Sequence, residues 1–374
     1  MIKSKNTDEL PLVKYASSLF KNIGLENTLV IGCQHILKPQ FQMFLSLFRL
    51  GLNPKNVFLL GKCYSTDNEA LKLFVNKGVH INKLSTYFDS HKSYDEEYKK
   101  YVKRFLIDIK KNVDFDNYKK IIIIDDGGFL INLANNYLKD YKIFAIEQTS
   151  AGYEKIKDLQ LNFPVINVAR SKAKLAHETP IIVNQFMKNL KYELSVLGTS
   201  PKKVLIIGNG VIGREIYKRL KKEKEVNIYD YIQEKSHFNS IDNLISKISE
   251  FDLIIGCTGK QSFPLSEYNN LKKNVILASA SSSDREFSAK NIRLLTKKYY
   301  DCHINIKVNE INLLNSGFPI TFTKHSIGSD GKDIQITMSL IFSAILLGIS
   351  KKYNSEIIEI DNKLQKLIIK EFQK

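Results

Sequence analysis

The chain has 374 residues, which predicts two domains, and 43% of them are hydrophobic, enough for buried cores. The formal net charge is +17, but the basic residues are spread along the chain and no zinc-finger or RNP-like motif is present. We therefore expect a small-molecule substrate rather than a nucleic-acid partner.

No apolar run approaches the length needed to span a bilayer, and the N-terminal segment lacks the apolar core of a signal peptide. The four cysteines show no metal-binding spacing and fit reduced thiols: Cys33, Cys63, Cys257 and Cys302. These features predict a cytoplasmic protein that binds neither a membrane nor a metal ion.

The first half of the chain alternates strand and helix patterns. Strands are expected over residues 28–31, 56–60, 121–124, 143–146 and 164–168, with another near Val79. Helices are expected between them, over residues 41–50, 69–76, 95–110 and 129–138. This alternation predicts a parallel sheet with helices on both faces, and the continuous apolar run Ile121–Ile124 suits a strand buried on both sides.

A helix pattern over residues 180–196 leads into a glycine-rich turn with the spacing of a dinucleotide-binding motif. A strand pattern from Val204 enters the turn Gly208, Asn209, Gly210, Val211, Ile212 and Gly213, and a helix, a second strand over 226–229 and Asp230 follow. Gly208 permits the tight turn, Gly210 lets the backbone approach a pyrophosphate, and Gly213 lets the helix pack on the strand. The helix N-terminus offers N–H groups to phosphates. Asp230 would bind ribose hydroxyls and repel a 2′-phosphate, which predicts NAD rather than NADP.

Further strands are expected over residues 252–256 and 274–278, and helices over 334–349 and 357–372. The predicted fold class is therefore α/β, with two doubly wound parallel-sheet domains, the second a Rossmann NAD-binding domain. The expected ranges are 1–184 for a substrate-binding and catalytic domain and 185–325 for the NAD-binding domain. Residues 326–374 are expected to form C-terminal helices that pack back on the first domain.

Each strong strand of the first half ends in a polar cluster. Ligands of open parallel sheets bind beyond the carboxyl ends of the strands, so these clusters predict a polar cleft. Their members include Cys33, His35, Ser65, Thr66, Asp67, Asp125, Asp126, Glu147, Gln148, Thr149, Asn167, Ser171 and Lys174. Each has a simpler alternative, because His35 alone would suit a structural role, one of the two aspartates would suit a cap of the next helix, and Lys174 would suit a solvated cation.

The polar segments resemble the S-adenosylhomocysteine hydrolase family over nearly the whole chain. The resemblance lies in the order and spacing of residues 32–35, 64–66, 95–98, 125–128 with 132–133, 147–152 and 164–168, and of the glycine turn, Cys257–Gly259 and 314–317. The family keeps NAD as a recycled cofactor. It oxidises a ribose hydroxyl, eliminates a thiol, adds water and reduces the ketone again.

The resemblance also implies roles for particular residues. His35 and Asp126 match acid/base positions, and Lys174 matches the lysine that assists oxidation, with Glu178 in place of its usual aspartate partner. The residues expected to bind NAD are Gly208, Asn209, Gly210, Val211, Ile212, Gly213, Asp230, Thr258, Gly259, Thr149, Ser150 and Asn315. The residues expected to bind substrate are Thr66, Gln148 and Thr179. A homo-oligomer and a role in one-carbon metabolism are also implied.

Several positions depart from the family. Gln148 stands where the family has a substrate-binding glutamate, and Ala169 and Thr179 replace asparagines of the active site. Leu37 and Pro39 replace polar residues near the adenine, and the serine-rich segment 278–283 replaces a histidine-containing loop. The family's aromatic, basic tail is not seen before Lys374. Losing several polar contacts to one substrate is costly, so these departures favour an altered substrate.

Three hypotheses follow. The first is an NAD-dependent enzyme that oxidises, permanently or transiently, a hydroxyl of a small polar molecule, with nucleosides among the candidates. The second is a divergent, true S-adenosylhomocysteine hydrolase. The third is a non-catalytic NAD or ligand sensor that keeps the two-domain architecture.

Overall fold

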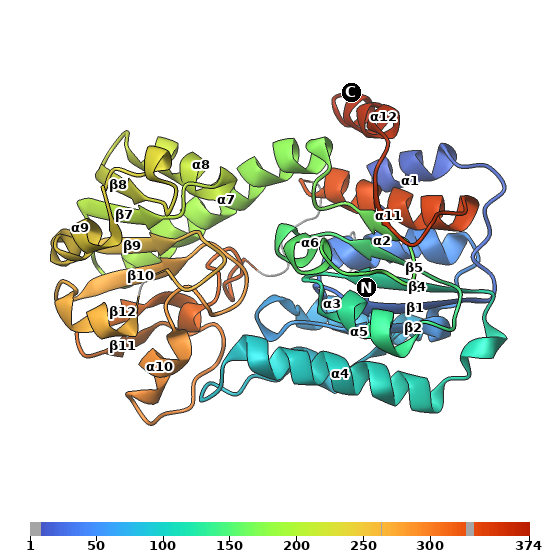
Figure 1. Ribbon diagram of the computed structural model, residues 1–374, viewed down its shortest axis with the longest axis horizontal. Helices are drawn as coiled ribbons and strands as arrows, with labels where there is room; N and C mark the ends of the chain where they lie inside the picture. Colours follow the sequence, from blue (N-terminus) through green and yellow to red (C-terminus); the bar gives the residue numbers. More distant parts are fainter. Residues whose placement is uncertain (1–8, 263, 327–332) are drawn as a thin grey trace, which may run out of the picture. The chain divides into compact units, whose positions relative to one another are not determined.

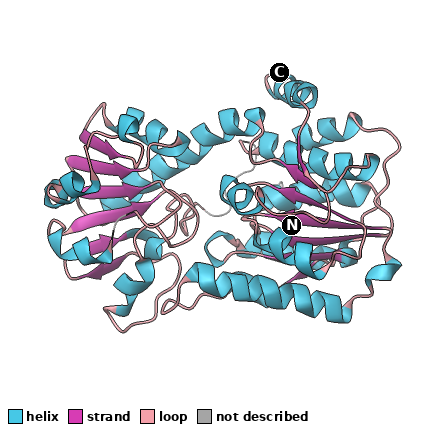
Figure 2. Ribbon diagram, in the orientation of Figure 1, coloured by secondary structure: helices cyan, strands magenta, loops and turns pink. Residues whose placement is uncertain are grey.

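The computed structural model describes residues 9–262, 264–326 and 333–374. The described residues divide into a first unit, of residues 9–87, 99–178 and 333–374, and a second unit, of residues 88–98, 179–262 and 264–326. Each unit contains one sheet with helices around it (Figure 1; Figure 2). The predicted α/β class with two sheet domains is therefore confirmed.

The sheet of the first unit is parallel throughout, in the order β13-β6-β5-β4-β1-β2-β3. The strands are β1 (Thr28–Cys33), β2 (Val57–Leu60), β3 (His80–Ile81), β4 (Lys120–Asp125), β5 (Ile143–Glu147), β6 (Val165–Asn167) and β13 (Ile357–Glu359). The chain builds outward from β1 through β2 and β3, then returns to β4 on the other side of β1. The strand order therefore reverses between β1 and β4, which is where doubly wound sheets bind ligands.

Helices cover both faces of this sheet. They are α1 (Pro11–Ser18), α2 (Lys38–Arg49), α3 (Asn68–Lys77), α4 (Tyr94–Asn112), α5 (Phe129–Tyr137), α6 (Ser150–Ile156), α11 (Gln335–Ser350) and α12 (Asn362–Phe372). Val30, Ile122 and Ile146 share one core with α1, α2, α3, α11 and α12. Their strand neighbours Ile31 and Ile123 are equally buried but lie outside that core, as expected of strands covered on both sides.

The C-terminal helices α11 and α12 belong to the core of the first unit, as predicted. The expected helix over residues 357–372 is wrong at its start, however. Ile357–Glu359 form the edge strand β13, which pairs with β6, and the helix begins at Asn362. Asp361 caps the helix by accepting a hydrogen bond from the Lys363 N–H at 2.6 Å.

The sheet of the second unit has the order β11-β12-β10-β9-β7-β8. Its strands are β7 (Lys203–Ile207), β8 (Glu225–Tyr229), β9 (Leu253–Gly256), β10 (Val275–Ser279), β11 (Ile306–Val308) and β12 (Ile311–Leu313), and only the pair of β11 and β12 is antiparallel among the described strands. Helices α8 (Val211–Leu220), α9 (Ile241–Ile245) and α10 (Ala289–Leu294) accompany it. Here the strand order reverses between β7 and β9.

Helix α7 (Lys172–Val196) begins before the predicted start at Pro180 and contains this proline in its interior. Proline usually opens a helix, which is why the sequence suggested a later start. The boundary between the two units falls within α7, after Glu178.

Residues 88–98, which the sequence analysis assigned to the first domain, cluster with the second unit. Arg293, which is fully buried, holds this segment by donating to the carbonyl oxygens of Ser90 at 2.7 Å and Lys92 at 3.0 Å. Arg285 adds an ion pair with Asp95, with 2.8 Å between Nε and Oδ2. No helix of the described ranges is long and apolar enough to cross a bilayer.

Short 3₁₀ helices connect many of these elements. They are η1 (Pro54–Asn56), η2 (Cys63–Ser65), η3 (Lys83–Thr86), η4 (Phe115–Asn117), η5 (Gln233–Lys235), η6 (Ile248–Glu250), η7 (Leu265–Asn270) and η8 (Leu314–Gly317). Two of them, η2 and η8, carry residues of the candidate sites described below.

Candidate functional site

The three glycines of the predicted dinucleotide turn differ in what the fold demands of them. Gly208 has a φ of +104°, and a Cβ there would lie 2.9 Å from the Cys257 carbonyl group. A Cβ on Gly213 would lie 1.9 Å from the Gly208 oxygen. Gly210, at the N-cap of α8, has a φ of −72°, and a Cβ there would meet nothing within 4 Å. The packing of the chain thus requires glycine at 208 and 213 but leaves the space beside Gly210 open.

The acid after β8 is tied to this turn. Asp230 accepts the Asn209 N–H at 2.7 Å and the Ile232 N–H at 3.0 Å, one on each carboxylate oxygen. Each oxygen keeps a further lone pair that suits a hydroxyl donor. The buried Oδ1 of Asn209 has no hydrogen-bond partner within the described chain. The turn therefore contains unused acceptors of the kind that ribose hydroxyls satisfy.

Thr258 and Gly259 follow β9 and lie beside Gly208. Two of their donors are already used, because the Gly259 N–H donates to Glu286 Oε1 at 2.6 Å and the Thr258 hydroxyl lies 2.9 Å from Glu286 Oε2. Glu286 is fully buried and also accepts from the hydroxyls of Ser262 and Ser281. These residues thus form a rigid wall of the turn. Glu286 was not predicted as a site residue, although its place soon after β10 was a usable signal.

Asn315, predicted to contact NAD, lies buried in η8 with a φ of +51°. Its amide nitrogen donates to the carbonyl oxygens of Pro319 and Phe322, at 3.1 Å each. Its own N–H donates to Asn305 Oδ1 at 2.9 Å. Within the second unit, Asn315 therefore holds a turn together.

In the first unit, a polar cluster lies where the strand order reverses, at the carboxyl ends of β1 and β4. The His35 Nε2 lies 3.1 Å from Asp126 Oδ2, and its Nδ1 lies 2.5 Å from Ser65 Oγ. Gln148, after β5, donates its amide to Asp126 Oδ2 at 2.6 Å. The structure thus brings together His35, Asp126 and Gln148, which the sequence analysis singled out separately.

The central member of this cluster is Lys62, which the sequence analysis did not select. Its ammonium group pairs with Asp126 Oδ1, and the two side chains are only 6% and 4% exposed. Burial raises the pKa of Asp126, but the Lys62 ammonium and His35 outweigh this effect and hold that pKa well below its usual range. Lys62 lies two positions after the end of β2, so the search for polar residues beyond strand ends would have included it.

Two further acids, Asp125 and Glu147, are buried next to the cluster as register partners of β4 and β5. Asp125 accepts the Ile131 N–H at 2.9 Å and so caps α5, while Glu147 accepts the N–H and the hydroxyl of Thr149, each at 2.7 Å. The other oxygen of each acid has no hydrogen-bond partner in the part of the chain that the structure describes. Burial raises the pKa of Asp125 to about 6, and burial and Asp125 raise that of Glu147 well above its usual range. The pair therefore binds a proton more tightly than isolated carboxyl groups do.

The predicted hydroxyl residues mostly support turns. Thr66 donates to the carbonyl oxygens of Lys62 at 2.9 Å and Ser85 at 3.0 Å. Thr149 caps α6 by accepting the Gly152 N–H at 3.0 Å, and Ser150, the first residue of α6, is exposed.

The predicted redox pair, Lys174 and Glu178, forms an ion pair one turn apart on α7, with side chains 12% and 16% exposed. Helix α7 follows β6, so Lys174 lies beyond the same carboxyl edge of the sheet as His35 and Asp126. Thr179 is the next residue of this helix after Glu178. A cation held by a carboxylate suits the stabilisation of a developing alkoxide.

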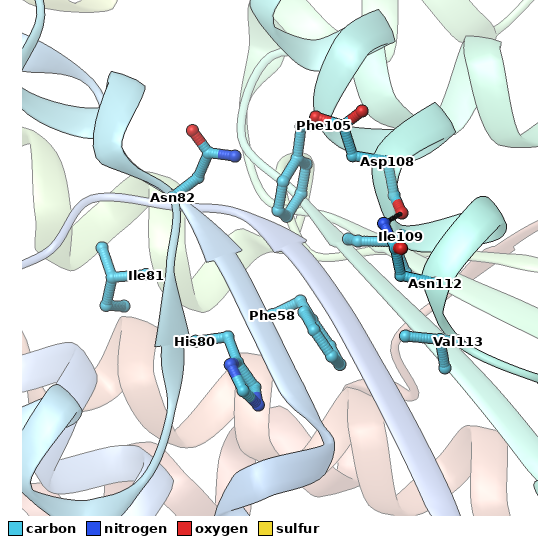
Figure 3. A pocket seen from close by; sticks show the side chains of 9 residues that line it. All are labelled: Phe58, His80, Ile81, Asn82, Phe105, Asp108, Ile109, Asn112 and Val113. Carbon is cyan, nitrogen blue, oxygen red and sulfur yellow. Dashed lines mark hydrogen bonds between the residues drawn. The ribbon is translucent and has the colours of Figure 1, made fainter.

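A separate hollow of about 250 Å³ lies between α4 and the edge strands β2 and β3 (Figure 3). His80 stacks on Phe58 there, with 4.5 Å between ring centroids. None of the predicted site residues lines this hollow.

No model of a known protein family matches the chain. Uncharacterized proteins from two strains of Mycobacterium tuberculosis are each 37% identical to it over 329 residues, which is 86% of this chain and 64% of each relative. The chain thus spans less than two thirds of the length of these relatives.

Solved structures with a weak overall likeness include NAD⁺-bound 3-phosphoglycerate dehydrogenase of Entamoeba histolytica, at 10% identity and a TM-score of 0.41, covering 87% of this chain and 100% of that chain. The A chain of dipicolinate synthase of Bacillus subtilis shares 11% identity at a TM-score of 0.41 and covers 88% and 97%. A D-isomer-specific 2-hydroxyacid dehydrogenase of Lactobacillus delbrueckii ssp. bulgaricus, complexed with NAD, shares 11% identity at a TM-score of 0.35 and covers 87% and 99%. At these scores the likenesses carry no argument about the activity of this chain.

Proposed function

We propose that the chain is an NAD-dependent enzyme that oxidises, permanently or transiently, a hydroxyl of a small polar substrate. The observation that carries this proposal is the glycine turn. Packing requires Gly208 and Gly213, whereas nothing in the described chain requires Gly210, whose missing side chain leaves room in front of α8. A pyrophosphate at a helix N-terminus is the ligand for which such room is built.

The residues around the turn fit NAD. The N-terminal N–H groups of α8 would hold the pyrophosphate, and Asp230 and Asn209 would accept the adenosine ribose hydroxyls. The Asp230 carboxylate would repel the 2′-phosphate of NADP. When bound, NAD supplies a hydride acceptor. The chain supplies binding, orientation and proton handling.

In the first unit, Lys174 would stabilise the negative charge that develops on the substrate oxygen, and Glu178 would orient its ammonium group. His35 would accept or return a proton. Glu147, whose pKa is raised well above its usual range, lies near the same sheet edge and in its protonated form would donate a hydrogen bond to an oxygen of the substrate.

Gln148 supports a substrate different from that of the S-adenosylhomocysteine hydrolases. Its amide donates to Asp126, at 2.6 Å, and so is committed within the protein. A neutral amide in this position does not replace the carboxylate that the resemblance implies for binding ribose hydroxyls. Thiol release from S-adenosylhomocysteine at the rate of an ordinary hydrolase would favour the divergent-hydrolase hypothesis instead.

The test is to denature the purified protein and to identify any released dinucleotide by chromatography and mass, then to titrate NAD and NADP into protein freed of ligand. We expect NAD to bind at least about tenfold more tightly than NADP, and Asp230→Asn to reduce that preference. A protein that releases no dinucleotide and binds neither would contradict the proposal. Binding of NAD without reduction by any hydroxyl compound would favour the sensor hypothesis.

A further inference from the structure

We propose that Lys62 is a positioning residue of the first unit: it fixes Asp126 as a permanent anion, so that His35 offers Nδ1 as a proton acceptor and Asp126 itself exchanges no proton with a substrate. The inference deepens the proposed function, on which it rests for the reaction that uses this proton. The charge states on which it depends belong to the protein alone.

The hydrogen bonds of Asp126 leave it no room for a proton. Lys62 donates to Oδ1, and the Gln148 amide at 2.6 Å and His35 Nε2 at 3.1 Å converge on Oδ2. An ammonium group has donors only, and an amide nitrogen is a donor. In a protonated Asp126 the O–H would face one of these donors in a buried site. Two donors that face each other cannot form a hydrogen bond, and the ionised form avoids this free-energy cost.

The ionised state of Asp126 decides which nitrogen of His35 carries the proton. An anion beside Nε2 requires a proton on that nitrogen, so the neutral ring has its lone pair on Nδ1. The Ser65 hydroxyl, 2.5 Å away, then donates to Nδ1. Ser65 is fully buried, whereas the His35 side chain is 18% exposed. Ser65 therefore orients the ring, and of the two side chains only that of His35 is partly exposed.

This arrangement sets the direction of proton transfer in the site. When the Ser65 side chain rotates away from Nδ1, a substrate hydroxyl that takes its place transfers its proton to that nitrogen, and the bonding electron pair stays on the substrate oxygen. The positive charge formed on the ring is stabilised by Asp126, and the reverse transfer restores the starting state. Asp126 acts through His35 throughout, which revises the acid/base role that the sequence analysis gave it.

Other charged groups near Asp126 do not replace Lys62. Asp125 and Glu147 are acids and would oppose a second negative charge, and Tyr64 lies near Lys62 as another acidic group. Lys155 interacts with Asp125 and donates to the Gly127 carbonyl oxygen at 2.7 Å. Among the described residues, Lys62 supplies the ammonium group that pairs with Asp126.

The test is nitrogen NMR of the histidine rings in the full-length protein, without cofactor or substrate, with His35→Gln used to assign the signal. At about pH 8, where an ordinary imidazole is neutral, we expect His35 to be protonated at Nε2 in the natural protein. In Lys62→Met the buried Asp126 takes up a proton, and its O–H donates a hydrogen bond to Nε2, so the ring proton moves to Nδ1. Lys62→Arg restores the Nε2 form.

A natural protein with the proton on Nδ1 overturns the proposal, and this outcome needs no variant to fold. The proposal is also overturned if His35 stays protonated at Nε2 in Lys62→Met, either as the neutral Nε2–H ring or as imidazolium. Asp126 would then be ionised without Lys62. The double variant Lys62→Met with Asp126→Asn replaces the ion pair by neutral groups and serves as the fold control. Since no NAD is present, failure here is distinct from failure of the proposed function.

Discussion

Replacing Gly213 by alanine separates the packing role of the glycine turn from its binding role. The added Cβ would lie 1.9 Å from the Gly208 carbonyl oxygen and 3.3 Å from Cys257 Cβ. Nonbonded heavy atoms prefer roughly 3.5 Å, so α8 or the turn must move by more than about 1 Å. The obstacle is backbone, and it belongs to a residue whose φ of +104° already restricts the turn.

The cost follows from these distances. Overpacking lowers the free energy of unfolding by about 1–3 kcal/mol, and the better helix propensity of alanine offsets at most about 1 kcal/mol of this loss. Because a backbone atom is the obstacle, we expect the upper part of this range and a net loss of about 2 kcal/mol. For a unit of this size such a loss lowers the melting temperature by about 4–8 °C.

The matched control is Gly210→Ala, whose Cβ would meet nothing within 4 Å. We expect its unfolding free energy to change by less than about 1 kcal/mol, while NAD affinity falls at least about tenfold. Scanning calorimetry measures the first quantity and titration calorimetry the second. A Gly213→Ala protein that melts with the natural protein would refute the packing argument. A Gly210→Ala protein that keeps its NAD affinity would refute the placement of the pyrophosphate.

Three other changes test the remaining features. The raised pKa of Glu147 means that the folded chain keeps a proton that the unfolded chain loses, so the free energy of unfolding falls as the pH rises from about 4 towards that raised pKa. Denaturant titrations at several pH values should show that the free energy of unfolding of Glu147→Gln rises relative to that of the natural protein over this range. A difference that does not change with pH would contradict the raised pKa of Glu147. Arg293→Met removes the donors that hold residues 88–98 and leaves Asp284 buried without its partner; we expect a loss of about 3–5 kcal/mol by denaturant titration, partly recovered by adding Asp284→Asn. Lys174→Ala should abolish NAD reduction in an assay with any accepted substrate while leaving NAD binding intact, and an unchanged rate would remove Lys174 from the mechanism.

The sequence pattern does not decide which of Asp125 and Asp126 caps the following helix, although it indicates that one of them does. Neighbouring residues of an extended segment point to opposite sides, so Asp125 reaches the Ile131 N–H and Asp126 reaches Lys62 and His35. Which side faces the next helix is decided only when the strand takes its place in the sheet.

The edge strand β13 is a second case. Its two apolar residues, Ile357 and Ile358, suit the start of an amphipathic helix as well as a short strand. A strand of three residues is too short for an alternating pattern to be recognised. It is the pairing with β6, distant in sequence, that makes it a strand.

The amino-acid sequence alone predicts the features that depend on neighbours along the chain. These are the alternation of strands and helices, the two sheet domains and the glycine turn, because hydrophobic periodicity and backbone freedom are local properties. Tertiary structure alone decided which polar groups meet. Lys62 and Asp126 are 64 residues apart, and Arg293 lies some 200 residues from the segment it holds. Such pairs leave no periodic signal, because the partners come together only where the parallel strands and their connections converge.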